Sequence, residues 1–69
     1  MITEIGICAG DIWHYLDQHG ESTFSALVQG IDKPRDLILM SLGWLAREGH
    51  ISVKTQGTSD YRVSFLRRS

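Results

Sequence analysis

Residues 36–50 form an amphipathic segment that changes its hydrophobic period at its end, and this constrains the fold more than any other stretch. At about 100° per residue, one stripe of a helix collects Ile38, Ser41, Leu42 and Leu45. Gly49 then ends the helical pattern, and from residue 51 the apolar residues recur every second position. The sequence therefore predicts a helix that packs on a core and leads directly into β-structure.

A β-hairpin is expected after this helix, with strands at residues 51–55 and 60–66. Apolar residues alternate with polar ones in both segments, at Ile51 and Val53 and then at Tyr61, Val63 and Phe65. Gly57 lies in the polar stretch between them and can adopt the positive φ that a tight turn requires. Each strand should therefore bury one face and expose the other.

Residues 5–19 predict a first helix with a narrow buried stripe. The apolar residues that repeat along this stripe are Ile5, Ala9, Ile12 and Leu16. Cys8 and Trp13 lie at its margins, and we interpret both as packing residues. Gly20 can end the helix in a left-handed conformation.

Between this helix and residue 36, the sequence predicts a short third strand and a second helix. The polar residues 21–23 are long enough for a two- or three-residue strand, and the second helix should span 24–29. Thr23 is a suitable N-cap for that helix, and Asp32 for the third helix, which we place at 34–48.

The expected order is helix, short strand, helix, helix and two strands, over a chain of 69 residues. Two helices joined by a short turn form a helix-turn-helix, and a hairpin placed after it forms a wing. The sequence therefore predicts an α+β winged helix, in which a three-helix bundle precedes a two-stranded wing. A chain of this length has room for one domain, residues 1–69.

This order of elements resembles the winged helix-turn-helix superfamily across nearly the whole chain. Residues 42–48 (LGWLARE), together with Ala9, Gly10 and Trp13, are similar to a narrower group of small stand-alone prokaryotic winged-helix domains of poorly defined role. The superfamily resemblance implies nucleic-acid binding, usually with the third helix in the major groove and the wing beside it. The narrower resemblance implies no particular activity.

The sequence contains none of the common catalytic or cofactor-binding motifs, such as a Gly-rich phosphate loop or a Gly-x-Ser-x-Gly turn. His14 and His19 would lie about 140° apart around a helix, and His50 stands alone, so the histidines do not form a metal site. We therefore expect no enzymatic activity, no metal, no cofactor and no small-molecule substrate.

The sequence also favours a cytoplasmic protein. No apolar run approaches the ~20 residues that a membrane span needs, and the N-terminus lacks the basic region of a signal peptide. The single cysteine, Cys8, cannot form an internal disulfide and is typical of a reducing compartment.

The net charge of −1 hides an uneven distribution. Residues 1–32 carry a charge of −5, whereas residues 33–69 carry seven cations, among them the terminal Arg67 and Arg68, and three anions, a charge of +4. Such a split favours a polyanionic partner. Cations on the elements that would approach a duplex are Arg35, Arg47, Lys54 and Arg62. They predict weak, low-specificity DNA binding by a module of the transcription-regulator type, because phosphate contacts position a protein without reading bases.

The outward side of the predicted third helix favours a different partner. It carries few groups that read base edges, since its residues are Asp36, Leu39, Met40, Gly43 and Arg47, with Trp44 at the margin of the buried stripe. Leu39, Met40, Gly43 and Trp44 could form an exposed apolar patch that binds another protein or a second copy of the chain. The cations would then be ordinary solubilising charges. The sequence therefore favours DNA binding as the first hypothesis and keeps protein contact or self-association as the alternative.

Overall fold

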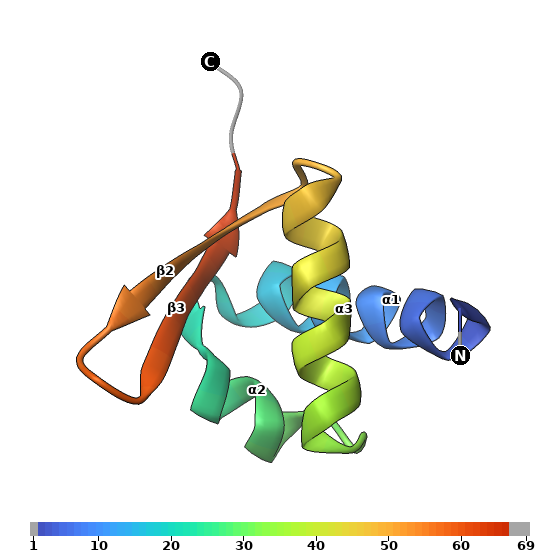
Figure 1. Cartoon of the computed structure of the whole chain (residues 1–69), viewed down its shortest axis with the longest axis horizontal. Coiled ribbons are helices and arrows are strands. Elements are labelled where there is room, and N and C mark those ends of the chain that lie inside the picture. The colour runs from blue at the N-terminus through green and yellow to red at the C-terminus, as the bar shows by residue number, and fades with distance from the viewer. Residues whose placement is uncertain (1, 67–69) are drawn as a thin grey trace.

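Three helices and a three-stranded antiparallel sheet follow one another along the chain (Figure 1). A computed structural model of the chain describes residues 2–66, so Arg67 and Arg68 lie outside the described residues. The elements are α1 (Ile2–His19), β1 (Ser22–Thr23), α2 (Phe24–Gly30), α3 (Arg35–Arg47), β2 (Ile51–Gln56) and β3 (Asp60–Phe65). This order confirms the predicted α+β winged helix, with the short third strand in place; the first helix begins three residues earlier than expected.

β3 is the central strand of the sheet, with β1 on one side and β2 on the other. Val63 pairs with both Val53 of β2 and Ser22 of β1. The same register places Lys54 directly opposite Arg62. Gly57 has a φ of 67° in the turn of the hairpin, as the sequence predicted.

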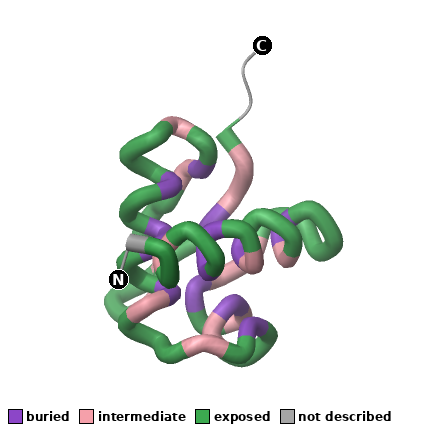
Figure 2. Tube along the Cα trace, turned by 90° about the vertical axis from the view of Figure 1, so that its right-hand side faces the viewer, coloured by how far each residue is buried: buried purple, intermediate pink, exposed green. Residues whose placement is uncertain are grey.

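The buried stripe of α3 is as predicted, and it packs mainly on α1. Ile38, Ser41, Leu42 and Leu45 are all buried, and Figure 2 shows the buried residues gathered where the helices and sheet meet. The Ser41 hydroxyl donates to the Leu37 carbonyl oxygen at 2.7 Å and lies 3.3 Å from the Ile5 carbonyl oxygen of α1. Its polar atom therefore has partners inside the core, which removes the cost of burying it.

The predicted N-cap residue is confirmed for α2 and is wrong for α3. The Thr23 hydroxyl accepts a hydrogen bond from the Ala26 amide at 3.1 Å and caps α2, as predicted. Asp32 does not cap α3, because Pro34 is the N-cap and makes no side-chain hydrogen bond. The first helical bond of α3 runs from the Ile38 amide to the Pro34 carbonyl, which leaves Asp32 two residues before the cap position.

The prediction that each strand buries one whole face is wrong for the outer half of the wing. Ile51 and Val63 are buried, but Val53 and Tyr61 on the same face are each 36% exposed. Val53 lies on the edge strand β2, directly across from the buried Val63 of the central strand, and Tyr61 lies next to the hairpin turn, which extends beyond the helices in Figure 1. Ring contacts with the helices occur at both ends of β3, where Phe65 packs against Trp13 of α1 with ring centroids 4.7 Å apart and Tyr61 lies edge-on to Phe24 of α2 at 6.1 Å.

Asp60, the first residue of β3, ties the outer wing to the start of α2. One carboxylate oxygen accepts from the backbone amides of Ser25 at 3.2 Å and Tyr61 at 2.8 Å, and the other accepts from the Ser25 hydroxyl at 3.0 Å. These donors, the Tyr61 amide foremost, lower the pKa of Asp60 below its ordinary value of 3.8. The ionised carboxylate therefore holds the hairpin turn against the helix-turn-helix.

We expect Leu45→Ala to lower the free energy of unfolding by about 2–5 kcal/mol, because it opens a cavity in the core. Ile7→Ala is the control, since it also shortens a large aliphatic side chain to alanine, at a position of α1 that is 56% exposed. Urea unfolding followed by circular dichroism measures both. Equal midpoints for the two variants would contradict the assignment of the buried stripe.

A second expectation concerns acid stability. Because the folded-state pKa of Asp60 is lowered, its contribution is complete above its ordinary pKa and is lost as the pH falls through the lowered value. Asp60→Asn should therefore melt at a lower temperature than the wild type near neutral pH, and the difference should shrink in acid. Thermal melts of both proteins across this range give the answer, and a difference that is constant with pH would refute the role of the charge.

Candidate binding surfaces on helix three and the wing

The side of α3 that faces away from the core is exposed and largely apolar. Leu39 and Met40 are each 42% exposed and Trp44 is 46% exposed. We call the exposed residues of this side the outer face of α3, namely Asp36, Leu39, Met40, Gly43, Trp44 and Arg47. Trp44 is therefore not buried in the core, and Trp13 of α1, which the sequence predicted as a packing residue, is likewise 45% exposed. The structure brings all four residues of the predicted apolar patch onto one helix face.

An apolar hollow of about 270 Å³ separates α3 from the wing. Its walls come from both elements and are formed by Leu39, Leu42, Gly43, Ala46, Val53 and Tyr61. We call it the wing hollow. Sequence reasoning missed the two wing residues, because strict alternation assigned Val53 and Tyr61 to the core. The length of the hairpin was the available signal for the exposure of these residues. β2 and β3 each have six residues and β1 has two, so β1 flanks only part of the hairpin.

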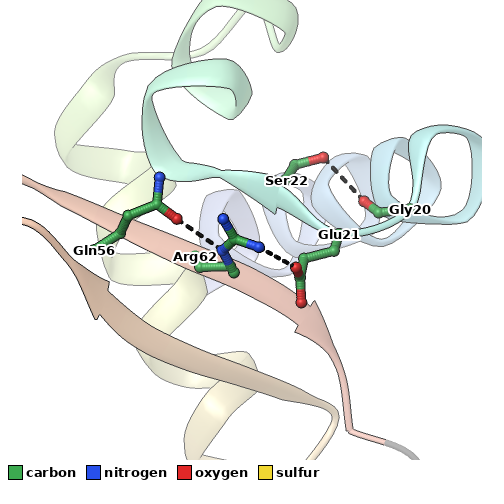
Figure 3. Close-up of polar contacts among 5 residues, drawn as sticks. All are labelled: Gly20, Glu21, Ser22, Gln56 and Arg62. Atoms are coloured by element: carbon green, nitrogen blue, oxygen red, sulfur yellow. Dashed lines mark hydrogen bonds and ion pairs between the residues drawn. The ribbon is translucent and has the colours of Figure 1, made fainter.

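The two cations of the wing lie on its solvent face but differ in their surroundings. The Arg62 guanidinium is held on two sides, with Nη1 2.7 Å from Glu21 Oε2 and Nε donating to Gln56 Oε1 at 2.7 Å (Figure 3). Within residues 2–66, Lys54 directly across from it makes no ion pair. Glu21 therefore neutralises about half of the positive charge that the sequence assigned to the wing. This partner is 41 residues away in the chain, and only the pairing of β1 with β3 brings it close.

The two arginines of α3 occupy its first and last positions, which are about 18 Å apart along the axis at 1.5 Å per residue. The Arg35 guanidinium carbon lies 5.1 Å from the centre of the Phe24 ring, in a cation–π contact with α2. Arg47 is exposed at the other end of the outer face and has no salt-bridge partner among the described residues. Lys54 and Arg62 thus lie side by side on the wing, whereas Arg35 and Arg47 lie at opposite ends of α3.

A larger hollow, of about 570 Å³, lies beside α1 and the turn before α3. Lys33 Nζ is 3.0 Å from Asp11 Oδ2 at its edge, and this hydrogen-bonded ion pair raises the pKa of Lys33. The Tyr15 ring stacks on His19 and lies against Gly30, where a Cβ atom would come within 2.4 Å of the ring. Glycine at position 30 is therefore needed for the close packing of α1 on α2.

Other classes of site are not found in the described part of the chain. Residues 2–66 contain no group of three or more His, Cys, Asp or Glu side chains placed to hold a metal ion. Cys8 is buried in the core, as the sequence predicted. No described helix is both long enough and apolar enough to cross a membrane.

The comparison with protein families gives a match over most of the chain. The model of the family described as "Winged helix-turn-helix domain (DUF2582)" matches residues 1–64. No curated protein and no solved structure matches the chain significantly. The family match covers all three helices and nearly all of the sheet, and its description agrees with the observed fold. The chain therefore belongs to this family of winged helix-turn-helix domains.

Proposed function

We propose that this winged helix is a non-enzymatic module that binds another protein through the outer face of α3 and the wing hollow. The observation that carries the proposal is the exposure of Leu39, Met40 and Trp44 on one helix face, beside a hollow that α3 and the wing build together. Apolar patches of this kind on soluble domains mark interaction sites, because exposing them to water is unfavourable.

The chemistry of the outer face does not suit base readout. In helix-turn-helix proteins the corresponding helix enters the major groove and reads base edges with Arg, Lys, Asn, Gln, Ser or Thr side chains. Here the middle of that face offers Met40, Gly43 and Leu39, which have no side-chain hydrogen-bonding groups. Asp36 in the first turn would repel phosphates. Arg47, at the last position of α3, is the one side chain of this face that is of a base-reading type, so the face is poor in groups for sequence recognition.

The wing hollow has the character of an anchoring pocket. Central anchor residues of protein interfaces are large side chains that fill well-defined apolar pockets. A space of about 270 Å³ between Val53, Tyr61 and the outer side of α3 is large enough for one such side chain. The partner would therefore place an apolar residue between helix and wing and cover Met40 beside it.

We expect a photo-crosslinking amino acid at position 40 to form covalent adducts with a partner protein in the native cells. The same group at position 18 is the control, because Gln18 is an exposed polar residue on α1. Mass spectrometry of the adducts identifies the partner. If position 40 yields no more adducts than position 18, the outer face of α3 is not a protein contact and the proposal falls.

A second candidate, weak DNA binding of the transcription-regulator type, is favoured by the register of the wing. Lys54 and Arg62 are cross-strand neighbours on its solvent face, and Arg35 and Arg47 add charge at the ends of α3. Membership of a winged helix-turn-helix family makes such binding plausible on the fold. Contacts from these residues would go to phosphates, so affinity would depend strongly on salt and little on sequence.

For this second candidate we expect Lys54→Ala to make the salt dependence of duplex binding shallower by about one unit. Arg62→Ala should have less effect, because Glu21 already occupies its guanidinium. Glu21→Gln should strengthen binding by releasing that charge, whereas Asp17→Asn, an equal change in net charge on exposed α1, should have little effect. Fluorescence anisotropy with a generic duplex measures all of these, and the absence of binding at low salt would rule out this role.

A further inference from the structure

We infer that the protein covering the outer face of α3 is a second copy of this chain, packed antiparallel along α3 around a two-fold axis. This inference rests on the proposed function, because it requires the outer face to be a protein contact. It goes further by naming the partner, which the pattern of side chains along the helix identifies.

The central stripe of the outer face is complementary to the same stripe on a second copy of α3 that runs in the opposite direction. It consists of Asp36, Met40, Gly43 and Arg47, separated by four, three and four residues. These four positions fall within about 60° of one another around the helix at 100° per residue. When a second α3 runs in the opposite direction with this stripe in contact, Asp36 faces Arg47 of the other copy and Met40 faces Gly43. A two-fold interface requires this kind of self-complementarity.

The charges at the two ends of the stripe favour the antiparallel arrangement. Asp36 lies in the first turn of α3 and Arg47 is its last residue. Neither forms a salt bridge with another residue in the described range 2–66. In the antiparallel pair each would meet an opposite charge, and the opposed helix dipoles would also attract. A parallel pair would place like charges against each other at both ends.

In the proposed dimer, the two α3 helices would approach each other most closely at Gly43. Glycine inside a helix is less favourable than alanine, so a packing reason is expected for it. No such reason lies within the described chain, because a Cβ atom built at Gly43 would meet nothing within 4 Å. A second copy supplies one, since a bare backbone at position 43 makes room for Met40 of the opposite helix.

The wing hollow fits the same arrangement. With Asp36 opposite Arg47, Leu39 of the second copy lies level with Gly43 and Ala46, which line the hollow. The two-fold axis keeps both wings on the same side of the helix pair. The solvent faces that carry Lys54 and Arg62 would then stay free, so a dimer of this form is compatible with phosphate contacts through the wings.

The test is sedimentation equilibrium of the purified chain, wild type and charge variants, with circular dichroism melts to verify folding. The wild type should dimerise, and Asp36→Arg or Arg47→Asp should each weaken the dimer roughly tenfold or more by opposing like charges twice per dimer. The double variant Asp36→Arg with Arg47→Asp should recover the wild-type association. A monomeric wild type at all concentrations, or a double variant no tighter than the single ones, would overturn the inference.

Gly43→Gln gives an independent readout, because glutamine is a good helix former and its Cβ meets no atom of the described chain. The variant should fold at least as stably per monomer and should fail to dimerise. Unchanged dimerisation would contradict the proposed helix contact at position 43. The crosslinks from position 40 separate the two proposals. If the adducts contain a different protein and the wild type is monomeric, the homodimer inference is wrong and the proposed protein-binding function stands. If position 40 forms no adducts, both proposals are wrong.

Discussion

The packing of one stripe of α3 on α1 is the constraint on which the rest of this structure depends. Ile38, Leu42 and Leu45 fill the core, and Ser41 is buried between the two helices with its hydroxyl hydrogen-bonded. Because the side chains of a helix have fixed positions around its axis, burying this stripe also determines which residues the opposite side exposes. The 3.6-residue period therefore fixes which residues lie on the outer face of α3, and their apolar character departs from the polar face of an ordinary amphipathic helix.

Polar contacts add to the apolar packing of Ile51, Val63 and Phe65 in holding the wing on the helices. Asp60 holds the turn end of the hairpin to α2, and the Glu21–Arg62 pair crosses from β1 to β3. Exposed pairs of this kind add little to overall stability. Their effect is on position and charge: the wing stands beside α3 so that Val53 and Tyr61 complete a hollow, and its solvent face loses part of its positive potential.

These two arrangements place the apolar and the cationic groups of the domain on different surfaces. The helix that would enter a groove carries apolar residues between an acid and a base, which suits another helix better than a nucleic acid. Cationic groups are instead on the solvent face of the wing and at the ends of α3. Protein contact through α3 and weak phosphate contact through the wing can therefore coexist in one small fold.

The sequence by itself determined the elements, their order and the buried stripe, because period, caps and glycines act within a few residues of one another. Ile38 to Leu45, Thr23 and Gly57 could all be read in this way. The location of the patch of Leu39, Met40, Gly43 and Trp44 could also be predicted from the sequence, because these residues lie on the side of the helix away from the buried stripe. Asp32 was misread because the backbone path into α3 places the cap at Pro34.

Only the tertiary structure decided what each candidate residue meets. Glu21 reaches Arg62, Phe24 reaches Arg35 and Asp60 reaches Ser25 across separations that no local pattern encodes. The exposure of Val53 and Tyr61 was decided in the same way, because alternation gives the face of a strand but not what covers it, and Val53 is on an edge strand beside the buried Val63. Burial and pairing are set by contacts between elements, and these exist only once the chain has folded.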